Sequence, residues 1–494
     1  MISKILNDKK YFKPTLLAII LFSIALNIII YYTGLYSISA DESGRTIHAY
    51  KWVTGTYEGV PTWLPFYTVI IGYGLKFFPD LFITPRIIIS IFGVSAFISF
   101  IWLTHELFKD RYITILSAVI ALFFPARAVL SSVPLSESMF YFFVFSAIAL
   151  FTRWLNTKNK NLLILTALSF ALSSSVRYEG WIFSAAFILS LIILKRLKEK
   201  EIKTGVIVTS IFIVLTFPVY WFIYQADISG NPLQFFNDMS KHYEHSVGIS
   251  FFSVLKNNYV VRFIHHNLIY LCFPGLILLV YLFLRESRIR NWVILPLLAF
   301  IPLAVISFTG KGIPTHNIWR IPELWNMLLI PFTASFIKNI NSFEIKFLKG
   351  LNGEAISLLA ILILIYYSFL IYSFKHESNF TKDELKIGRY VENNLIRPDA
   401  NSKILIEVPD WSFLHIAVAS NNPGRFVKSS EGGNPKIRRN TTITDSCKID
   451  MAELINRNIK YIMAKTPELK DRITHNPFFI KKKKFNGWSV YEIK

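Results

Sequence analysis

Long apolar runs separated by short polar segments dominate the first three quarters of the chain. Several runs approach the roughly 20 residues that a helix needs to cross the hydrocarbon core of a bilayer. The segment 64–78 is also apolar, but it is short and includes Pro65 after Pro61, so we expect a partly embedded helix there. The pattern predicts about eleven membrane helices, at residues 14–35, 84–105, 112–130, 137–153, 161–176, 181–195, 204–224, 263–284, 291–308, 323–337 and 355–374.

The end of the chain follows a different pattern. Short runs rich in β-formers and flanked by helix-like stretches predict a small α/β fold. The expected strands are 403–408, 461–464 and 488–493, and the expected helices are 383–394 and 450–456. We interpret the basic cluster Lys481–Lys484 as a solvated turn.

Together these patterns predict the fold class and two domains. We expect an α-helical polytopic membrane domain over residues 1–375, with a first outer loop at 36–83. A soluble α/β domain over residues 376–494 follows it.

Basic residues gather in alternate loops, which indicates the orientation. With the N-terminus in the cytoplasm, every even-numbered loop is rich in Lys or Arg, as the positive-inside rule requires. An odd number of spans then places the C-terminal domain on the non-cytoplasmic side. The outer loops are 36–83, 131–136, 177–180, 225–262 and 309–322, and they carry acidic residues, His, Trp and isolated Arg rather than basic runs. We therefore expect any chemistry on the outer face.

Composition excludes several classes of protein. The chain is 53% hydrophobic and only 17% charged, whereas soluble domains carry about 25% charged residues. The net charge of +21 lies largely in loops between apolar segments, so it predicts membrane orientation rather than a nucleic-acid partner. The two cysteines, Cys272 and Cys447, provide neither a disulfide framework nor a Cys-rich zinc site. Residues 14–32 lack a small-residue cleavage site and are too long for a signal peptide, so we interpret them as a first membrane helix.

Two adjacent carboxylates follow the first apolar run. Asp41 and Glu42 stand where the chain leaves the membrane, with Arg45 and His48 one and two helical turns further on. Ionisable groups at a membrane surface are costly and suggest function. The alternative is that Asp41 only caps a short helix, as Asp often does.

Later outer segments add further polar motifs in a fixed order. They are Pro61-Thr-Trp-Leu-Pro65, the turn Pro134-Leu-Ser-Glu137, and Arg177-Tyr-Glu-Gly-Trp181. With the early Asp-Glu pair, these motifs resemble the GT-C superfamily of membrane glycosyltransferases, and most of all the protein O-mannosyltransferases and the lipid A aminoarabinose transferase. The resemblance covers residues 1–375 in layout, and the C-terminal domain agrees only in position.

The resemblance implies inverting transfer of a sugar, such as mannose or another hexose, from a dolichyl- or undecaprenyl-phosphate carrier. The acceptor would be a glycan, a lipid or a protein at the outer surface. Asp41 would be the general base, and Glu42 would orient Asp41 or the acceptor. The leaving phosphate requires cations, although any single Arg or Lys at a helix end can also be a snorkelling residue. The residues expected to contact the substrate or the lipid phosphate are Arg45, His48, Arg127, Glu137, Arg177, Glu179, Lys311, His316 and Arg320.

A metal site is a weaker hypothesis. His242 and His245 flank a carboxylate at a spacing that suits zinc on a helix. The same segment also reads as a polar stretch of an outer loop. No cofactor is required by the pattern, and the resemblance leaves a divalent metal open.

Three other functions compete with this interpretation. A transporter or flippase of a lipid-linked sugar would place charges near the bilayer midplane and often shows internal repeats, whereas here the charges cluster at one face. An oligosaccharyltransferase would carry a Trp-Trp-Asp-Tyr-Gly type motif in its soluble domain, which this sequence lacks. A non-catalytic scaffold has no use for the Asp41-Glu42 pair.

Overall fold

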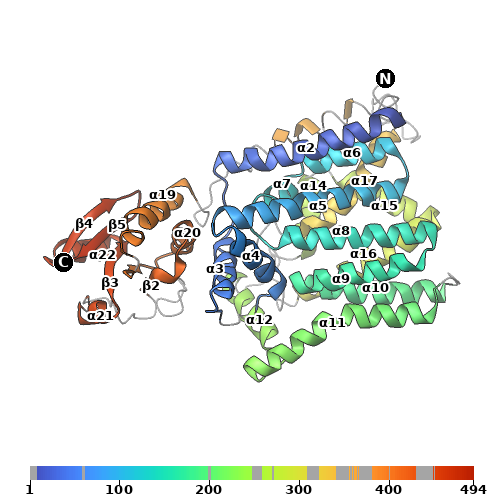
Figure 1. Cartoon of the computed structure of the whole chain (residues 1–494). Coiled ribbons are helices and arrows are strands. Elements are labelled where there is room, and N and C mark those ends of the chain that lie inside the picture. The colour runs from blue at the N-terminus through green and yellow to red at the C-terminus, as the bar shows by residue number, and fades with distance from the viewer. Residues whose placement is uncertain are drawn as a thin grey trace.

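A long helical bundle and a small mixed sheet make up the computed structural model (Figure 1). It describes residues 8–57, 62–197, 202–247, 259–269, 272–308, 322–340, 381–399, 401–429 and 451–494, with single residues or short pieces at 355–366 and 449. All structural statements below concern these residues.

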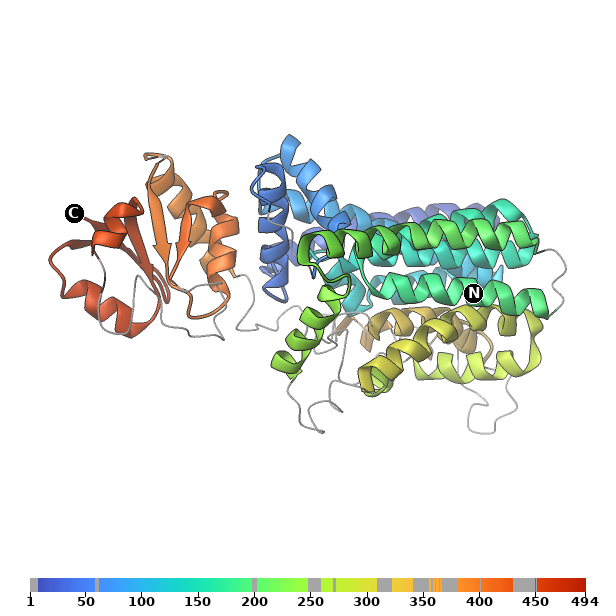
Figure 2. The same ribbon diagram turned by 90° about the horizontal axis from the view of Figure 1, so that it is seen from below.

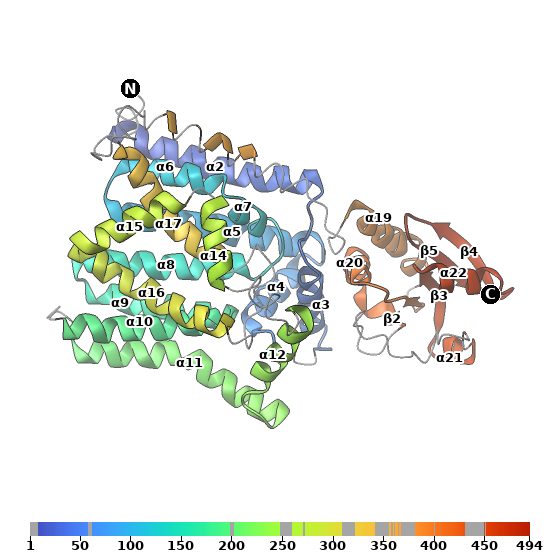
Figure 3. The ribbon, with the colours of Figure 1, turned by 180° about the vertical axis from the view of Figure 1, so that it is seen from behind.

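The bundle contains fifteen described helices, labelled α2 to α17 without α13, and its long members run side by side (Figures 1 and 3). The helices are α2 (Lys9–Thr33), α3 (Asp41–Val53), α4 (Pro65–Phe77), α5 (Ile83–Phe108), α6 (Arg111–Leu122), α7 (Pro125–Leu130), α8 (Glu137–Thr157), α9 (Lys160–Val176), α10 (Glu179–Arg196), α11 (Thr204–Ser229), α12 (Gln234–Val247), α14 (Tyr259–Ile269), α15 (Phe273–Arg285), α16 (Ser287–Phe308) and α17 (Pro322–Lys338).

Five of the described helices, α2, α5, α8, α11 and α16, are long and apolar enough to cross a membrane. Three shorter ones, α6, α9 and α15, are also apolar. Many of their large apolar side chains face outward, for example Phe212, which is 72% exposed. Lipid is the solvent that suits such a surface, and we conclude that the chain is an integral membrane protein.

Two predicted spans are each two helices in the structure, so those predictions were wrong. The span 112–130 is divided into α6 and α7 at Phe124, whose backbone is extended. Pro125 causes the break, because proline excludes the helical conformation from the residue before it and cannot donate to the preceding turn. The span 263–284 is divided into α14 and α15, and Pro274 stands in the first turn of α15.

Three of the predicted outer loops, 36–83, 131–136 and 177–180, meet at one end of the bundle, which we call the α3 end. The Tyr67 hydroxyl of α4 donates to the Pro134 carbonyl at 2.6 Å, and the Trp221 indole of α11 donates to the Tyr178 hydroxyl at 3.2 Å. The predicted inner loops meet at the opposite end, where the Arg288 guanidinium donates to the Glu106 carbonyl at 2.8 Å. The alternation inferred from charge therefore agrees with the way in which the loops assemble.

The C-terminal sheet has the strand order β2-β1-β3-β5-β4. Strands β2, β1 and β3 are parallel, and β5 is antiparallel to both β3 and β4. The elements are α19 (Lys382–Val391), a π-helical turn (Glu392–Ile396), β1 (Lys403–Ile406), α20 (Ser412–Ala419), a 3-10 turn (Pro423–Arg425), β2 (Phe426–Lys428), α21 (Met451–Asn456), β3 (Ile459–Ala464), α22 (Pro467–Thr474), β4 (Phe479–Lys484) and β5 (Ser489–Ile493).

The interpretation of Lys481–Lys484 as a turn was wrong, because these residues belong to strand β4. The strand lies at the edge of the sheet, and its lysine side chains are exposed. Charged edge strands are a common way to prevent pairing with another chain. A basic run is therefore compatible with a strand at this position.

Candidate active site

Helix α3 begins at Asp41, immediately after the chain has left α2 and turned through residues 34–40. Asp41 is the first helical residue and Ala40 occupies the N-cap position, so Asp41 is not the cap itself. A carboxylate in the first turn is stabilised by the helix dipole. The Asp41 side chain is partly exposed, as an acid that meets a substrate must be.

Glu42 holds the loop before α3. Its carboxylate accepts hydrogen bonds from the Ile38 amide at 2.8 Å, the Ser39 amide at 3.2 Å and the Ser39 hydroxyl at 2.8 Å. The Ser39 hydroxyl in turn accepts from the Asp41 amide at 3.3 Å. Burial raises the pKa of the Glu42 carboxyl to about 7, against the hydrogen bonds that lower it. Glu42 therefore positions the backbone that carries Asp41.

Aromatic rings lie beside Arg45 and His48, the other two predicted site residues of α3. The Arg45 guanidinium lies 4.8 Å from the centroid of Trp63 and 5.7 Å from that of Tyr67. The His48 ring meets Trp63 edge to face with centroids 4.9 Å apart. Burial, together with the charges of Lys51 and Arg45, lowers the pKa of the His48 imidazole to about 4. Near neutral pH His48 is therefore uncharged, and the positive charge around it comes from Arg45, Lys51 and Lys428.

Glu137, Arg177 and Glu179 come together as one buried ion cluster. The Arg177 guanidinium donates to the Glu137 carboxylate at 3.0 Å and to the Glu179 carboxylate at 2.8 Å. It also donates to the Ser136 hydroxyl at 3.1 Å. Because two carboxylates neutralise one guanidinium, this cluster does not present the net positive charge that a phosphate requires. Its evident effect is to tie the Pro134–Glu137 turn to the start of α10.

Arg127 lies apart from α3. Its guanidinium donates to the Ser23 hydroxyl of α2 and to the Leu122 carbonyl at the end of α6, both at 2.8 Å. Ser23 precedes the end of α2 by ten residues, and at 1.5 Å per residue this is about 15 Å along the helix. The sequence predicted Arg127 near the outer end of a span. In the structure it lies well inside the bundle, where it contacts the last residue of α6.

The C-terminal sheet docks on the same α3 end, with α3 between it and the long helices (Figure 2). The Ser43 hydroxyl and the His415 Nδ1 atom are 2.8 Å apart. The Leu81 amide donates to the Asn421 side chain at 2.8 Å, and Arg389 pairs with Asp80 at 2.8 Å. Sequence reasoning missed all of these residues. The available signal was His415, a lone histidine in the apolar run 413–419.

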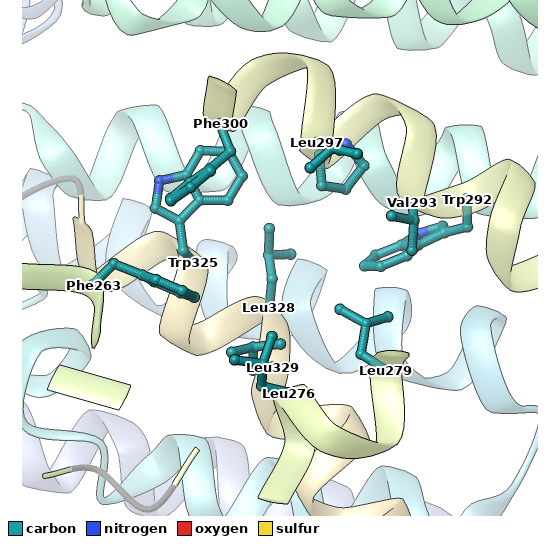
Figure 4. Close-up of a pocket in the computed structure, with 11 residues that line it drawn as sticks. Phe263, Leu276, Leu279, Trp292, Val293, Leu297, Phe300, Trp325, Leu328 and Leu329 are labelled. Carbon is teal, nitrogen blue, oxygen red and sulfur yellow. The ribbon is translucent and has the colours of Figure 1, made fainter. Parts of the chain in front are cut away.

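An apolar cavity of about 200 Å³ lies among α14, α15, α16 and α17. Figure 4 shows Phe300 and Trp325 close together at one side of it and Trp292 with Leu279 at the other. The ring centroids of Phe300 are 5.2 Å from those of both Phe263 and Trp325. Its lining is entirely apolar, which suits a hydrocarbon chain rather than a sugar.

The side chains of five predicted site residues lie outside the part of the chain that the structure describes. Lys311, His316 and Arg320 lie outside the described residues. His242 and His245 belong to helix α12, as the zinc hypothesis required, but their side chains are outside the description. Among the described residues, no three His, Cys, Asp or Glu side chains are grouped so that they could hold a metal.

Comparison with known proteins adds a family match over part of the chain and a fold. Residues 58–233 match the family model of the dolichyl-phosphate-mannose-protein mannosyltransferases. None of the curated protein sequences matches the chain.

Two solved structures share the architecture over nearly the whole chain. ArnT from Cupriavidus metallidurans bound to undecaprenyl phosphate is 9% identical with a TM-score of 0.66, and the match covers 96% of this chain and 97% of that one. The archaeal oligosaccharyltransferase AglB from Archaeoglobus fulgidus, in complex with an inhibitory peptide and a dolichol-phosphate, is 13% identical with a TM-score of 0.58, and the match covers 92% of this chain and 69% of that one. The resemblance inferred from the sequence is thereby confirmed: the chain has the fold of the GT-C membrane glycosyltransferases.

Proposed function

We propose that this protein is an inverting glycosyltransferase that moves a sugar from a polyprenyl-phosphate donor to an acceptor on the non-cytoplasmic side of the membrane. The observation that carries the proposal is the placement of Asp41. It is a partly exposed carboxylate at the first position of α3, directly after a loop that Glu42 holds by hydrogen bonds. The matching family supports a hexose, and mannose first, as the transferred sugar.

In the proposed step Asp41 takes the proton from the acceptor nucleophile. The nucleophile attacks the anomeric carbon, a bond forms on one face of the sugar, and the bond from that carbon to the phosphate oxygen breaks on the other. The products are the glycosylated acceptor and the polyprenyl phosphate. A base and a leaving group on opposite faces give inversion.

Arg45 is the described cation best placed to meet the leaving phosphate. It follows Asp41 by one helical turn, so the two residues share a face of α3. Its guanidinium is packed against Trp63 and Tyr67 rather than stretched into solvent. Preorganised cations of this kind stabilise charge that develops in the transition state. Lys311, His316 and Arg320 remain candidates for the same role.

The apolar cavity supports a lipid-linked donor. Its lining of aliphatic and aromatic side chains offers the contacts that a prenyl chain makes. ArnT and AglB, which share the fold, are described with undecaprenyl phosphate and dolichol-phosphate respectively. We propose that part of the donor chain lies in this cavity, among membrane lipids.

We further propose that residues 1–375 are the membrane domain and that residues 376–494 stand on the non-cytoplasmic side. The basic inner loops support this orientation. The docking of the sheet on α3, beside Asp41, supports a role for it in the approach of the acceptor.

The test is sugar transfer from radiolabelled polyprenyl-phosphate mannose and other polyprenyl-phosphate hexoses in proteoliposomes. Asp41→Asn is compared with the native chain and with Asp227→Asn, an exposed carboxylate at the end of α11. We expect acceptor-dependent transfer by the native chain and by the Asp227 variant, and none by the Asp41 variant. Equal transfer by all three would remove Asp41 from the mechanism, and movement of labelled lipid between leaflets without transfer would favour a flippase.

A further inference from the structure

A second cavity, which we call the basic cavity, lies where α2 begins, at the end of the bundle far from α3 (Figure 1). Its volume is about 680 Å³, within the range of roughly 300–1,000 Å³ that is usual for ligand pockets. The start of α2, the end of α5 and the start of α6 line it. Four of the lining side chains are cations and one is a carboxylate: Lys9, Lys13, Lys109, Arg111 and Asp110.

The carboxylate does not offset these cations, because it is already paired. Asp110 is the N-cap of α6 and forms an ion pair with Lys338, which does not line the cavity. Among the cations, Lys109 is paired in the same way with Glu106 of α5. The remaining positive charge of the lining comes from the two lysines of α2 and from the arginine of α6.

Phe12 brings the three elements together around this space. Its ring centroid lies 5.7 Å from that of His105 on α5, and the Arg111 guanidinium of α6 lies 5.9 Å from it. Lys9 and Lys13 flank Phe12 on one face of α2, because they are one helical turn apart. Both lysines are exposed, and neither forms an ion pair with any described residue. They are therefore available to an anion.

Membrane orientation explains why this end is basic, but not why the cations converge on a cavity. The positive-inside rule requires Lys and Arg in the loops at one end, wherever they lie in those loops. Lys158 and Lys160 meet that requirement in a neighbouring loop, where the Asn156 side chain donates to the Glu106 carbonyl at 2.9 Å, and neither lysine lines the cavity. Cations held around one space repel each other unless an anion joins them, and phosphate is an anion that Lys and Arg commonly bind.

The apolar surface beside the cavity points to a lipid as the source of the phosphate. Leu17 and Leu21 follow Lys13 at steps of four residues, so all three share one face of α2. The two leucines are 58% and 56% exposed, and in a membrane such side chains contact acyl chains. A phospholipid whose phosphate meets Lys13 can lay its chains along this face, whereas a free phosphate gains nothing from it.

We propose that the basic cavity binds the headgroup phosphate of an anionic glycerophospholipid, in the leaflet at this end of the bundle. Basic pockets at the ends of membrane helices suit such headgroups. Bound lipid would join the start of α2 to the turn between α5 and α6. The site is distinct from Asp41 and from the apolar cavity, and the proposal does not depend on sugar transfer.

Binding to the purified full chain in detergent tests the proposal. The probes are dioctanoyl phosphatidylglycerol, dioctanoyl phosphatidylcholine, glycerol phosphate and inorganic phosphate. The test variant carries Lys9→Gln and Lys13→Gln together, and a second variant with Lys9→Arg and Lys13→Arg keeps the charge. The matched control carries Lys158→Gln and Lys160→Gln, which remove the same charge from the same end but outside the cavity. The single variants Lys9→Gln and Lys13→Gln serve if the double variant does not fold.

We expect the native chain to prefer phosphatidylglycerol to the other three probes. The Gln variant at Lys9 and Lys13 should lose about tenfold in affinity for it, which corresponds to 1.4 kcal/mol. The Arg variant and the matched control should bind it as the native chain does. An equal loss in the matched control would overturn the proposal, because the attraction would then be a general effect of charge. Equal affinity for the two lipids, or for inorganic phosphate or glycerol phosphate and phosphatidylglycerol, would overturn it as well.

Discussion

Ser43 and His415 are 372 positions apart in the chain, yet the Ser43 hydroxyl and the His415 Nδ1 atom lie within hydrogen-bond distance in a fully buried setting. Ser43 is the second residue after Asp41, so this contact joins the C-terminal sheet to the helix that carries the proposed base. The C-terminal domain thus makes a direct side-chain contact with α3 and does not merely lie beside it.

Replacing His415 should weaken the attachment of α3. His415→Ala removes a buried partner of the Ser43 hydroxyl, a loss of about 1–3 kcal/mol. We expect lower transfer activity and faster proteolytic release of the C-terminal domain, measured on the same purified sample. His475→Ala is the matched control, because the His475 side chain is 76% exposed in the same domain. Equal proteolysis of the two variants would contradict this role.

Arg177 should prove to be a structural cation. Arg177→Met leaves the buried Glu137 and Glu179 carboxylates without their partner. Breaking a buried pair in this way costs about 3–5 kcal/mol, so we expect a large fall in the melting temperature in detergent. Adding Glu137→Gln to this variant should restore part of the loss. A raised KM for the donor at an unchanged melting temperature would instead support the phosphate-binding role predicted from the sequence.

Glu42 should make stability depend on pH. Its pKa is raised to about 7 in the folded protein from an ordinary value of 4.5. The folded state therefore binds the proton more tightly, and the stabilising contribution is complete below about pH 4.5 and is lost as the pH rises to about 7. Glu42→Gln cannot ionise, and its side chain can still accept from the Ile38 and Ser39 amides. We expect the melting temperature of the native chain to fall between pH 5 and 8 more steeply than that of Glu42→Gln, and parallel curves would refute the assignment.

Filling the apolar cavity should affect long-chain donors selectively. Val293→Trp places a large ring in a space of about 200 Å³ that Val293 lines. We expect KM to rise about tenfold for a long polyprenyl-phosphate donor and to change little for a short-chain analogue, if a lost chain contact is worth about 1.4 kcal/mol. Val280→Trp, at a side chain that is 53% exposed on α15, controls for the bulk of the ring. An equal rise for both donors would place the chain elsewhere.

The sequence predicted those features that apolar length and local charge determine. The helical segments follow from apolar length, and their alternating direction follows from the charge of the loops. The Asp41-Glu42 pair stands out because ionisable residues rarely follow an apolar run without a reason. The break in 112–130 was missed because Phe123, Phe124 and Pro125 all count as apolar, although Pro125 should have signalled it.

Pairing between distant segments could not be predicted from local patterns. From the sequence, Arg177 was predicted to be a cation available to the substrate. The sequence does not show that Glu137, 40 residues earlier, forms an ion pair with the same guanidinium. Asn326 on α17 is fully buried, but it lies within the apolar run 323–337, where one amide changes the mean hydropathy little. Its burial depends on the packing of α14 and α15 against α17.

The docking of the sheet also has a consequence for the order of events during synthesis. A ribosome makes Asp41 and the rest of α3 early, but His415, Asn421 and Arg389, which hold this region, emerge only when most of the chain has been made. The surroundings of α3 therefore cannot be completed while the chain is still growing. A nascent or prematurely terminated chain would insert its helices into the membrane and yet remain inactive, so that activity arises only in molecules translated past residue 421.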